Sequence, residues 1–220
     1  GGTAANSVIA PVGADGTVCF FSSVGTDFVV DLAGWFPVGA DESFVPMSPV
    51  RHVDTRDGTG GRATPLTPGS PYVFRVAGIT GSRPDGTAAV IPDDALAVSL
   101  NVTSSRATGR GYITVWPCSA DRPLASNVNL VPNGAVGNGV IAPIDDDGNV
   151  CIHSSTTTEL IIDVAGYFPD TGDQDPTFTA TVPQRLVDTR IGTGAPERRV
   201  SPGAPLEIPI SGAGLTSVDG

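Results

Sequence analysis

The chain of 220 residues is acidic, with 23 Asp and Glu residues against 12 basic residues and a formal net charge of −11 at pH 7. Such a chain repels phosphate backbones and anionic lipid, so we expect no nucleic acid partner; since no apolar run is long enough to span a bilayer, we also expect no membrane insertion. Every basic residue is an arginine, and the absence of lysine excludes Schiff-base lysines, the Walker lysine and lysine-based isopeptide cross-links.

Residues 1–37 predict two or three short strands. The Asp-Gly pair within residues 14–17 is typical of a tight turn between the apolar run 7–12 and a returning strand at 18–22. Residues 28–32 then alternate so that one face is apolar, which indicates a strand buried on at least one side. We expect the aromatic pair at 35–36 to pack as a lid on the end of a module, with an exposed platform for sugar as the alternative.

Residues 38–48 and 170–182 carry Gly, Pro and acidic residues and are expected to be short, semi-rigid linkers. Between them, residues 49–169 hold eight strand candidates and no convincing helix. The candidates are 50–55, 72–76, 96–103, 112–116, 126–130, 139–144, 149–153 and 160–165. Short strands separated by Gly, Pro, Asp and Asn predict an all-β fold, a β-sandwich with Greek-key or jelly-roll connections. A β-trefoil is less favoured because residues 49–169 contain no threefold repeat.

Two internal matches indicate that the chain is built from repeats. Residues 53–60 read VDTRDGTG, and residues 187–194 read VDTRIGTG at an offset of 134. Residues 6–37 align without gaps on residues 138–169 at an offset of 132, with 17 of 32 positions identical. We therefore expect residues 49–169 to be one complete repeat in a tandem array. In this interpretation residues 1–37 are the C-terminal part of a preceding repeat, and residues 183–220 are the N-terminal part of a following one.

The three cysteines follow the repeat. Cys19 and Cys151 are equivalent positions, and the equivalent of Cys118 would lie before Gly1. We predict a disulfide between Cys118 and Cys151, which a chain-entropy argument values at roughly 3–4 kcal/mol. Such a bridge indicates an oxidising, extracellular setting. Three buried free thiols are the alternative.

The VDTRxGTG motif predicts a structural turn. We expect its Asp to cap the turn, its Arg to donate to nearby carbonyls or carboxylates, and its two Gly to adopt positive φ. A catalytic role lacks a partner nucleophile, and no phosphate loop, serine elbow, Cys-x-x-Cys pair or His-Glu-x-x-His sequence points to a cofactor or metal. The motif residues are Asp54, Arg56, Gly58 and Gly60 in one copy, and Asp188, Arg190, Gly192 and Gly194 in the other.

Residues 145–149, Asp-Asp-Asp-Gly-Asn, superficially resemble a calcium loop. They lack the distal glutamate of an EF-hand, and their repeat counterpart has one acid, so a hairpin turn is favoured while calcium binding between Asp145 and Asp147 stays open. His52 and His153 align with Leu186 and Phe21, so neither imidazole belongs to the repeat pattern.

Several segments together resemble one family. The VDTRxGTG opening, LNVT at 100–103, TVWPC at 114–118, SNVN at 126–129 and DVAGYF at 163–168 are similar to the large repeats in secreted and surface proteins of actinobacteria and related bacteria. The resemblance covers nearly the whole chain. It implies an extracellular location and a repeat architecture, and it carries over no catalytic residues.

These features favour a structural extracellular protein rather than an enzyme, a surface stalk, sheath or filament formed by head-to-tail association. Its partners would be copies of itself or adjacent repeats, because the strands at both ends lack partners that the complete repeat provides. The alternative is a carbohydrate- or surface-binding adhesin module. That module would use Trp35, Tyr112, Trp116 or Tyr167 as stacking surfaces.

Overall fold

The structure, a computed structural model, describes residue 7 and residues 15–22, 24–35, 44–83, 86–170 and 179–209. Every regular element in these ranges is a β-strand, which confirms the all-β prediction. Within the same ranges, no helix is long and apolar enough to cross a membrane.

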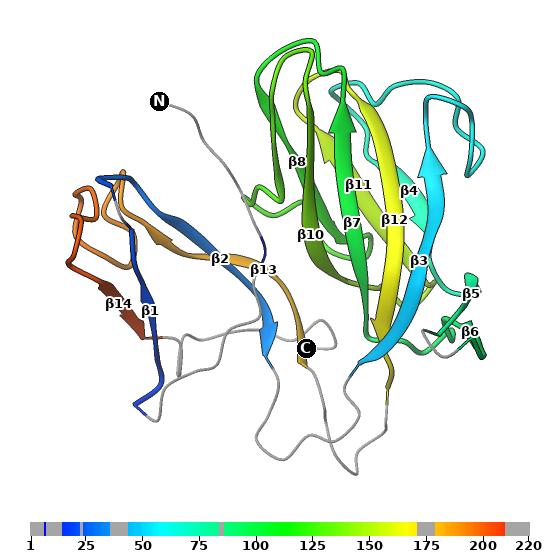
Figure 1. Cartoon of the computed structure of the whole chain (residues 1–220), viewed down its shortest axis with the longest axis horizontal. Helices are drawn as coiled ribbons and strands as arrows, with labels where there is room; N and C mark the ends of the chain where they lie inside the picture. Colours follow the sequence, from blue (N-terminus) through cyan, green and yellow to red (C-terminus); the bar gives the residue numbers. More distant parts are fainter. Residues whose placement is uncertain are drawn as a thin grey trace.

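Residues 45–168 form a β-sandwich of two four-stranded antiparallel sheets, which we call the complete module (Figure 1). The first sheet has the order β10-β7-β12-β3 and the second the order β4-β11-β8-β9. The first contains β3 (Val45–Asp54), β7 (Ala97–Ser105), β10 (Ala135–Pro143) and β12 (Glu159–Phe168). The second contains β4 (Tyr72–Arg75), β8 (Gly111–Pro117), β9 (Val128–Leu130) and β11 (Asn149–Ser154). A strand was predicted from the sequence at each of these eight places.

Alternating apolar side chains fill the space between the two sheets. On β7, Leu100 and Val102 are buried while Asn101 between them is exposed, as the period of two in a strand requires. Leu100 from the first sheet belongs to the same apolar cluster as Ile113 and Ile152 from the second. Burying one such side chain stabilises the fold by about 1.5–3 kcal/mol. The shared apolar core therefore holds the two sheets together.

The chain crosses from one sheet to the other at most of its connections. One crossing is made by residues 97–118, which we call the β7–β8 arch. This segment carries β7 in the first sheet, β8 in the second, and then Cys118. Both strands are central, since β7 lies between β10 and β12, and β8 lies between β9 and β11. The arch therefore contributes an inner strand to each sheet.

One hairpin was not predicted from the sequence, and two strands begin inside segments that were expected to be linkers. The missed hairpin is β5 (Thr80–Ser82) and β6 (Ala88–Val90), and a Cβ at Gly81 in β5 would come within 2.6 Å of Met47 on β3. β3 begins at Val45, inside the segment expected to be a linker, because the ring of Phe44 packs 5.0 Å from that of Phe168 at the end of β12. Likewise β13 (Thr179–Asp188) begins inside the segment 170–182.

Strands from the two ends of the chain pair with each other. β2 (Val29–Trp35) pairs with β13, and β1 (Thr17–Phe20) pairs with β14 (Leu206–Pro209), each in antiparallel fashion. We call these four strands the end module. It was expected that another stretch of array or another subunit would complete each end; here the strands of one end pair with those of the opposite end of the same chain.

The end module repeats the strand register of the complete module. Val30 lies opposite Val187 as Ile162 lies opposite Val53, with the repeat offsets of 132 and 134 applied to the two strands. The same offsets convert the β11–β4 register into the β1–β14 register at all four positions, and the isolated bridge of Leu66 and Thr158 into that of Thr26 and Val200. The four end strands are therefore placed as their counterparts are in the sandwich.

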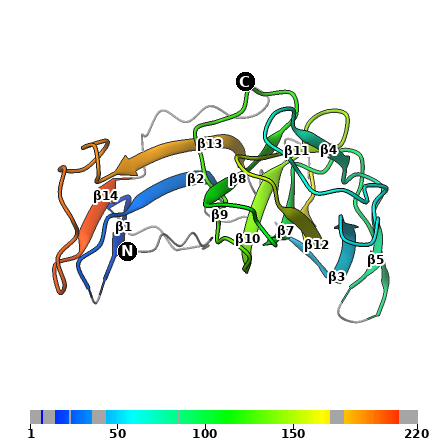
Figure 2. The same ribbon diagram turned by 90° about the horizontal axis from the view of Figure 1, so that it is seen from above.

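The end module lies beside the complete module near β8, β9 and β10 (Figure 2). The backbone N–H of Ser7 donates to the side-chain oxygen of Asn138 on β10 at 3.0 Å. The carboxylate of Asp31 on β2 accepts a hydrogen bond from the backbone of Ser126, which precedes β9. These contacts are polar.

Candidate functional site

The repeated Asp-Thr-Arg motif sits at the end of β3, where the chain turns out of the sheet. The carboxylate of Asp54 accepts hydrogen bonds from the Arg56 backbone N–H at 3.1 Å, Arg56 Nε at 2.8 Å, Arg56 Nη2 at 2.6 Å and Arg51 Nη1 at 3.2 Å. The Asp54 side chain is only 1% exposed, whereas Arg56 and Arg51 are 38% and 45% exposed. A buried carboxylate is thus neutralised by two guanidinium groups that reach solvent.

The threonine of the motif ties this turn to β12. The backbone N–H of Thr55 donates to the Leu160 carbonyl at 3.0 Å, and the Thr55 hydroxyl accepts the Leu160 N–H at 2.9 Å while donating to the Glu159 carboxylate. Both Thr55 and Leu160 are buried, so these bonds satisfy backbone groups that have no access to water. The threonine therefore extends the β3–β12 pairing beyond the last strand residue.

The two glycines of the motif permit the turn. Gly58 and Gly60 have φ of +86° and +78°, in the left-handed region that residues with a side chain rarely adopt. The Gly58 N–H donates to the Asp54 carbonyl at 3.0 Å, and the Asp54 N–H donates to the Thr59 carbonyl at 3.0 Å. A Cβ at Gly60 would come within 2.5 Å of the His52 carbonyl oxygen, so this position also needs glycine for space.

The second copy of the motif has the same geometry in the end module. Asp188 accepts from the Arg190 backbone N–H at 3.0 Å, Arg190 Nε at 2.8 Å and Arg190 Nη2 at 2.5 Å, and its side chain is again 1% exposed. The Phe28 N–H donates to the Thr189 hydroxyl at 3.1 Å, as Leu160 does to Thr55. Gly192 and Gly194 have φ of +74° and +61°, and a Cβ at Gly194 would collide with the Leu186 carbonyl.

Hydrogen bonding sets the protonation state of both aspartates. The bonds from Arg56 lower the pKa of Asp54 to about 2, against an opposing effect of burial, and the bonds from Arg190 lower the pKa of Asp188 to about 2 in the same way. A carboxylate with so low a pKa is a weak base at neutral pH. Its acceptor positions are also occupied by the arginines, so this geometry holds a turn in place and offers little for proton transfer.

Two ion pairs next to the motif, one in each module, were not predicted from the sequence. Arg51 Nε and Nη2 donate to the two oxygens of Asp163 on β12 at 2.7 and 3.1 Å, and Arg185 Nε donates to Asp31 at 3.3 Å in the end module. A signal was present in the sequence, since Arg51 and Arg185, and Asp163 and Asp31, are equivalent positions in the two copies. It was overlooked because the two members of each pair are far apart along the chain.

The predicted disulfide joins Cys118 to Cys151, with their Cα atoms 5.0 Å apart. Trp116 lies opposite Cys151 in the β8–β11 register and donates from Nε1 to the Ala120 carbonyl at 3.0 Å. Next to the bridge is an open depression of about 390 Å³, whose lining includes Trp116, His153 and Arg122. Burial, and secondarily the charge of Arg122, lower the pKa of His153, which favours the neutral imidazole.

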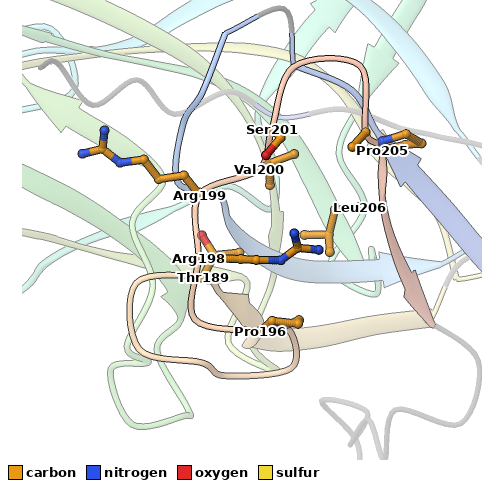
Figure 3. Close-up of a pocket in the computed structure, with 9 residues that line it drawn as sticks. Thr189, Pro196, Arg198, Arg199, Val200, Ser201, Pro205 and Leu206 are labelled. Carbon is orange, nitrogen blue, oxygen red and sulfur yellow. The ribbon is translucent and has the colours of Figure 1, made fainter.

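A second, much smaller pocket of about 20 Å³ lies in the end module between the second motif and β14. Thr189, Val200 and Leu206 line it, and Figure 3 shows that the side chains of Arg198 and Arg199 extend from its rim in different directions. The volume is about that of one water molecule, so it holds no organic ligand.

The acidic segment at 145–149 is a turn, as favoured from the sequence. Asp145 Oδ1 accepts the Asp147 N–H at 3.1 Å and the Asn149 N–H at 2.7 Å, and Gly148 has φ of +76°. Asp145 is buried while Asp146 and Asp147 are exposed. No group of three or more potential metal ligands occurs in the described part of the chain.

The aromatic residues considered for sugar stacking differ in exposure. Trp116 and Tyr167 are 4% and 7% exposed, so their ring faces are covered, while Trp35 and Tyr112 are partly exposed. Phe36, expected to form a lid together with Trp35, lies outside the described residues. His52 contacts the Arg75 carbonyl through Nε2 at 3.1 Å, which accounts for its position without a ligand.

No protein-family model, no curated protein and no solved structure matches this chain.

Proposed function

We propose that the protein is a structural extracellular repeat protein whose modules associate head to tail into a cell-surface stalk, sheath or filament. The single observation that carries this proposal is the second, register-matched half of a sandwich that the chain builds from its own ends. A half sandwich with open edges recruits further strands. In a head-to-tail contact the two joined surfaces differ, so each added chain leaves one such surface free. The assembly can therefore grow as an open filament instead of closing into a symmetric dimer.

Three further features support the proposal. The motif residues of both copies stabilise a turn, because arginine side chains donate hydrogen bonds to both carboxylate oxygens of each buried aspartate. The Cys118–Cys151 disulfide suits an oxidising, extracellular location. The resemblance of the sequence to repeats of secreted and surface proteins in actinobacteria and related bacteria agrees with that location.

Electron microscopy of the purified chain, with light scattering as a function of concentration, tests the proposal. We expect ordered linear particles that grow with concentration. In a variant with Leu32→Asp on β2, whose side chain is half-buried, the particles should be lost while the unfolding transition of the complete module remains. Leu124→Asp is the matched control, since Leu124 is 77% exposed on the complete module and the change should leave assembly intact. A strictly monomeric protein with both ends well protected from hydrogen exchange would refute the proposal.

A further inference from the structure

The open depression beside the disulfide lies on the outer face of the second sheet of the complete module. Trp116 on β8 and His153 on β11 line it, and their sequence neighbours Val115 and Ile152 belong to the apolar core. Successive side chains of a strand point to opposite faces, so Trp116 and His153 face away from that core. The volume of about 390 Å³ is in the range of small-molecule sites.

The loop that follows β8 is fastened over this outer face. The disulfide ties the start of the loop to β11. Trp116 Nε1 donates to the Ala120 carbonyl at 3.0 Å, and the Thr114 hydroxyl donates to the Ala125 carbonyl at 2.7 Å. The fold itself therefore sets the shape of the depression, and a ligand meets groups that are already in position.

His153 is the unusual residue of this lining. It is 7% exposed, yet within the described part of the chain neither ring nitrogen has a hydrogen bond, and Nδ1 is buried. Nearly all buried polar side-chain atoms of proteins have a partner. The repeat does not require a nitrogen at this position, because the equivalent residue is Phe21. The imidazole thus offers a ligand its less buried nitrogen, Nε2.

Two charged residues, Arg122 and Asp121, also line the depression, and both are exposed. After the larger effect of burial, the charge of Arg122 lowers the pKa of His153, which places the guanidinium near the ring. Arg122 has no hydrogen-bond or ion-pair partner among the described residues, and its planar fork of donors matches a carboxylate. Asp121 accepts hydrogen bonds and repels further negative charge. Together these groups favour a ligand with one carboxylate and several hydroxyl groups over a dianion.

We propose that this depression binds a small hydroxylated monocarboxylate of one-ring size, with a hexuronic acid unit as the class that fits best. Arg122 holds the carboxylate at two points, and the Nε2–H of His153 donates a third hydrogen bond. Asp121 accepts hydrogen bonds from the ring hydroxyls, and the apolar face of the sugar ring lies against Pro71, which is exposed in the lining. The site belongs to the complete module alone, so it does not depend on how modules assemble.

The net charge of −11 opposes the approach of an anion at long range. Salt at about 0.1 M screens charges that are more than about 10 Å apart, so at this ionic strength the contact with Arg122 outweighs the distant carboxylates. An open depression covers only part of a ligand, and we therefore expect a dissociation constant of about 1 mM.

Saturation-transfer NMR on the full chain, which detects weak ligands on particles of any size, tests the site at about 0.1 M salt. We expect galacturonate to give a saturable signal. Galactose, which has a hydroxymethyl group in place of the carboxylate, should bind at least about tenfold more weakly. Acetate lacks the ring, and it should compete with galacturonate at least about tenfold more weakly than galacturonate binds. Equal affinities of acetate and galacturonate would mean an adventitious ion only and would overturn the proposal.

A trimer of galacturonate distinguishes the two sources of this chemistry. Tighter binding of the trimer than of the monomer would identify a unit within an acidic polysaccharide, and equal binding would identify a free sugar acid. Both results support the site, whereas binding of neither compound would overturn it.

Three variants locate the binding. Arg122→Gln should weaken galacturonate binding at least about tenfold, and His153→Phe, which copies the equivalent Phe21, should weaken it as well. Arg110→Gln is the matched control and should leave binding unchanged, since Arg110 is exposed on the complete module and does not line the depression. Urea unfolding checks the fold of each variant, and the exposed position of Arg122 keeps the test valid if His153→Phe fails to fold. Unchanged binding in Arg122→Gln, or an equal loss in Arg110→Gln, would contradict the proposal.

Discussion

Arg51 and Asp163 form a two-point ion pair where the β3–β12 register shifts. Arg51 Nε and Nη2 lie 2.7 and 3.1 Å from the two carboxylate oxygens of Asp163, and the shift lies between Ile162 and Asp163. In the end module, Arg185 and Asp31 are joined at 3.3 Å, again next to a register shift. A bulge adds a residue to one strand and disrupts the ladder locally. The charged pair thus connects the two strands where backbone pairing is irregular.

Replacing Arg51 with Ala should destabilise the complete module modestly. Arg51 is 45% exposed, so its pair with Asp163 is screened by water, but the loss also removes one partner of the buried Asp54. We expect a loss of about 1 kcal/mol in the free energy of unfolding measured with urea. Arg51→Lys is the control: it keeps the charge but cannot donate at two points, and it should recover only part of the loss. Full stability in Arg51→Ala would contradict a bracing role.

Replacing Arg56 with Ala should cost more, because the change removes the two side-chain donors, Nε and Nη2, that Arg56 supplies to a carboxylate that is 1% exposed. The expected loss is about 1–3 kcal/mol, since a buried acceptor is left partly unpaired. Urea unfolding followed by tryptophan fluorescence measures it, because Trp116 is in the complete module. If Arg56→Ala instead abolished a hydrolytic activity at unchanged melting temperature, the motif would be an active site.

Stability should fall steeply at low pH. Hydrogen bonds from Arg56 and Arg190 lower the pKa of Asp54 and Asp188 from 3.8 to about 2 in the folded chain. A folded pKa below the unfolded one means that the stabilisation is complete above pH 3.8 and is lost as pH falls toward 2. The double variant Asp54→Asn and Asp188→Asn should be less stable at pH 7 and show a shallower decline in this window. Some slope should remain, because the pKa of Asp15 and of Asp57 is lowered as well.

Gly60 and Gly61 form a matched pair for testing the motif turn. Both have positive φ, +78° and +85°, so alanine is strained at either position, but a Cβ at Gly60 meets the His52 carbonyl oxygen and one at Gly61 meets nothing within 4 Å. We expect Gly61→Ala to cost about 1 kcal/mol from backbone strain alone, and Gly60→Ala to cost roughly 1–3 kcal/mol more from the added overlap. Thermal unfolding of the two variants measures the difference. Equal costs would mean that the turn relaxes away from His52.

The three cysteines should differ in reactivity. In the folded protein Cys19 is exposed and should be alkylated readily, whereas Cys118 and Cys151 should appear as a linked peptide in a non-reduced digest. Reduction should lower the free energy of unfolding by roughly 3–4 kcal/mol on the chain-entropy estimate, because the bridge restricts the unfolded chain. Finding both Cys118 and Cys151 alkylated without a reductant would contradict the bridge.

Much of the complete module was predictable from local pattern. The alternation around Leu100 predicted β7 because a strand places successive side chains on opposite faces. The disulfide between Cys118 and Cys151 could be predicted because the repeat assigns both cysteines to the same unit. The hairpin of β5 and β6 was missed because its strands have three residues each and contain Gly81, so they carry no measurable period. The ion pair of Arg51 and Asp163 was missed because only the folded sheet brings the two residues together.

From the amino-acid sequence alone, we could identify the repeated unit, the equivalent residues of its copies and the positions of most strands. These properties depend on residue type and on spacing along the chain. The folded chain was needed to see that Val30 pairs with Val187 and Cys19 with Glu207, so that opposite ends of the chain build half of a second sandwich. The physical reason is that strand pairing uses backbone groups common to all residues and joins segments at any separation. Partner choice therefore depends on which edges and apolar faces meet in three dimensions.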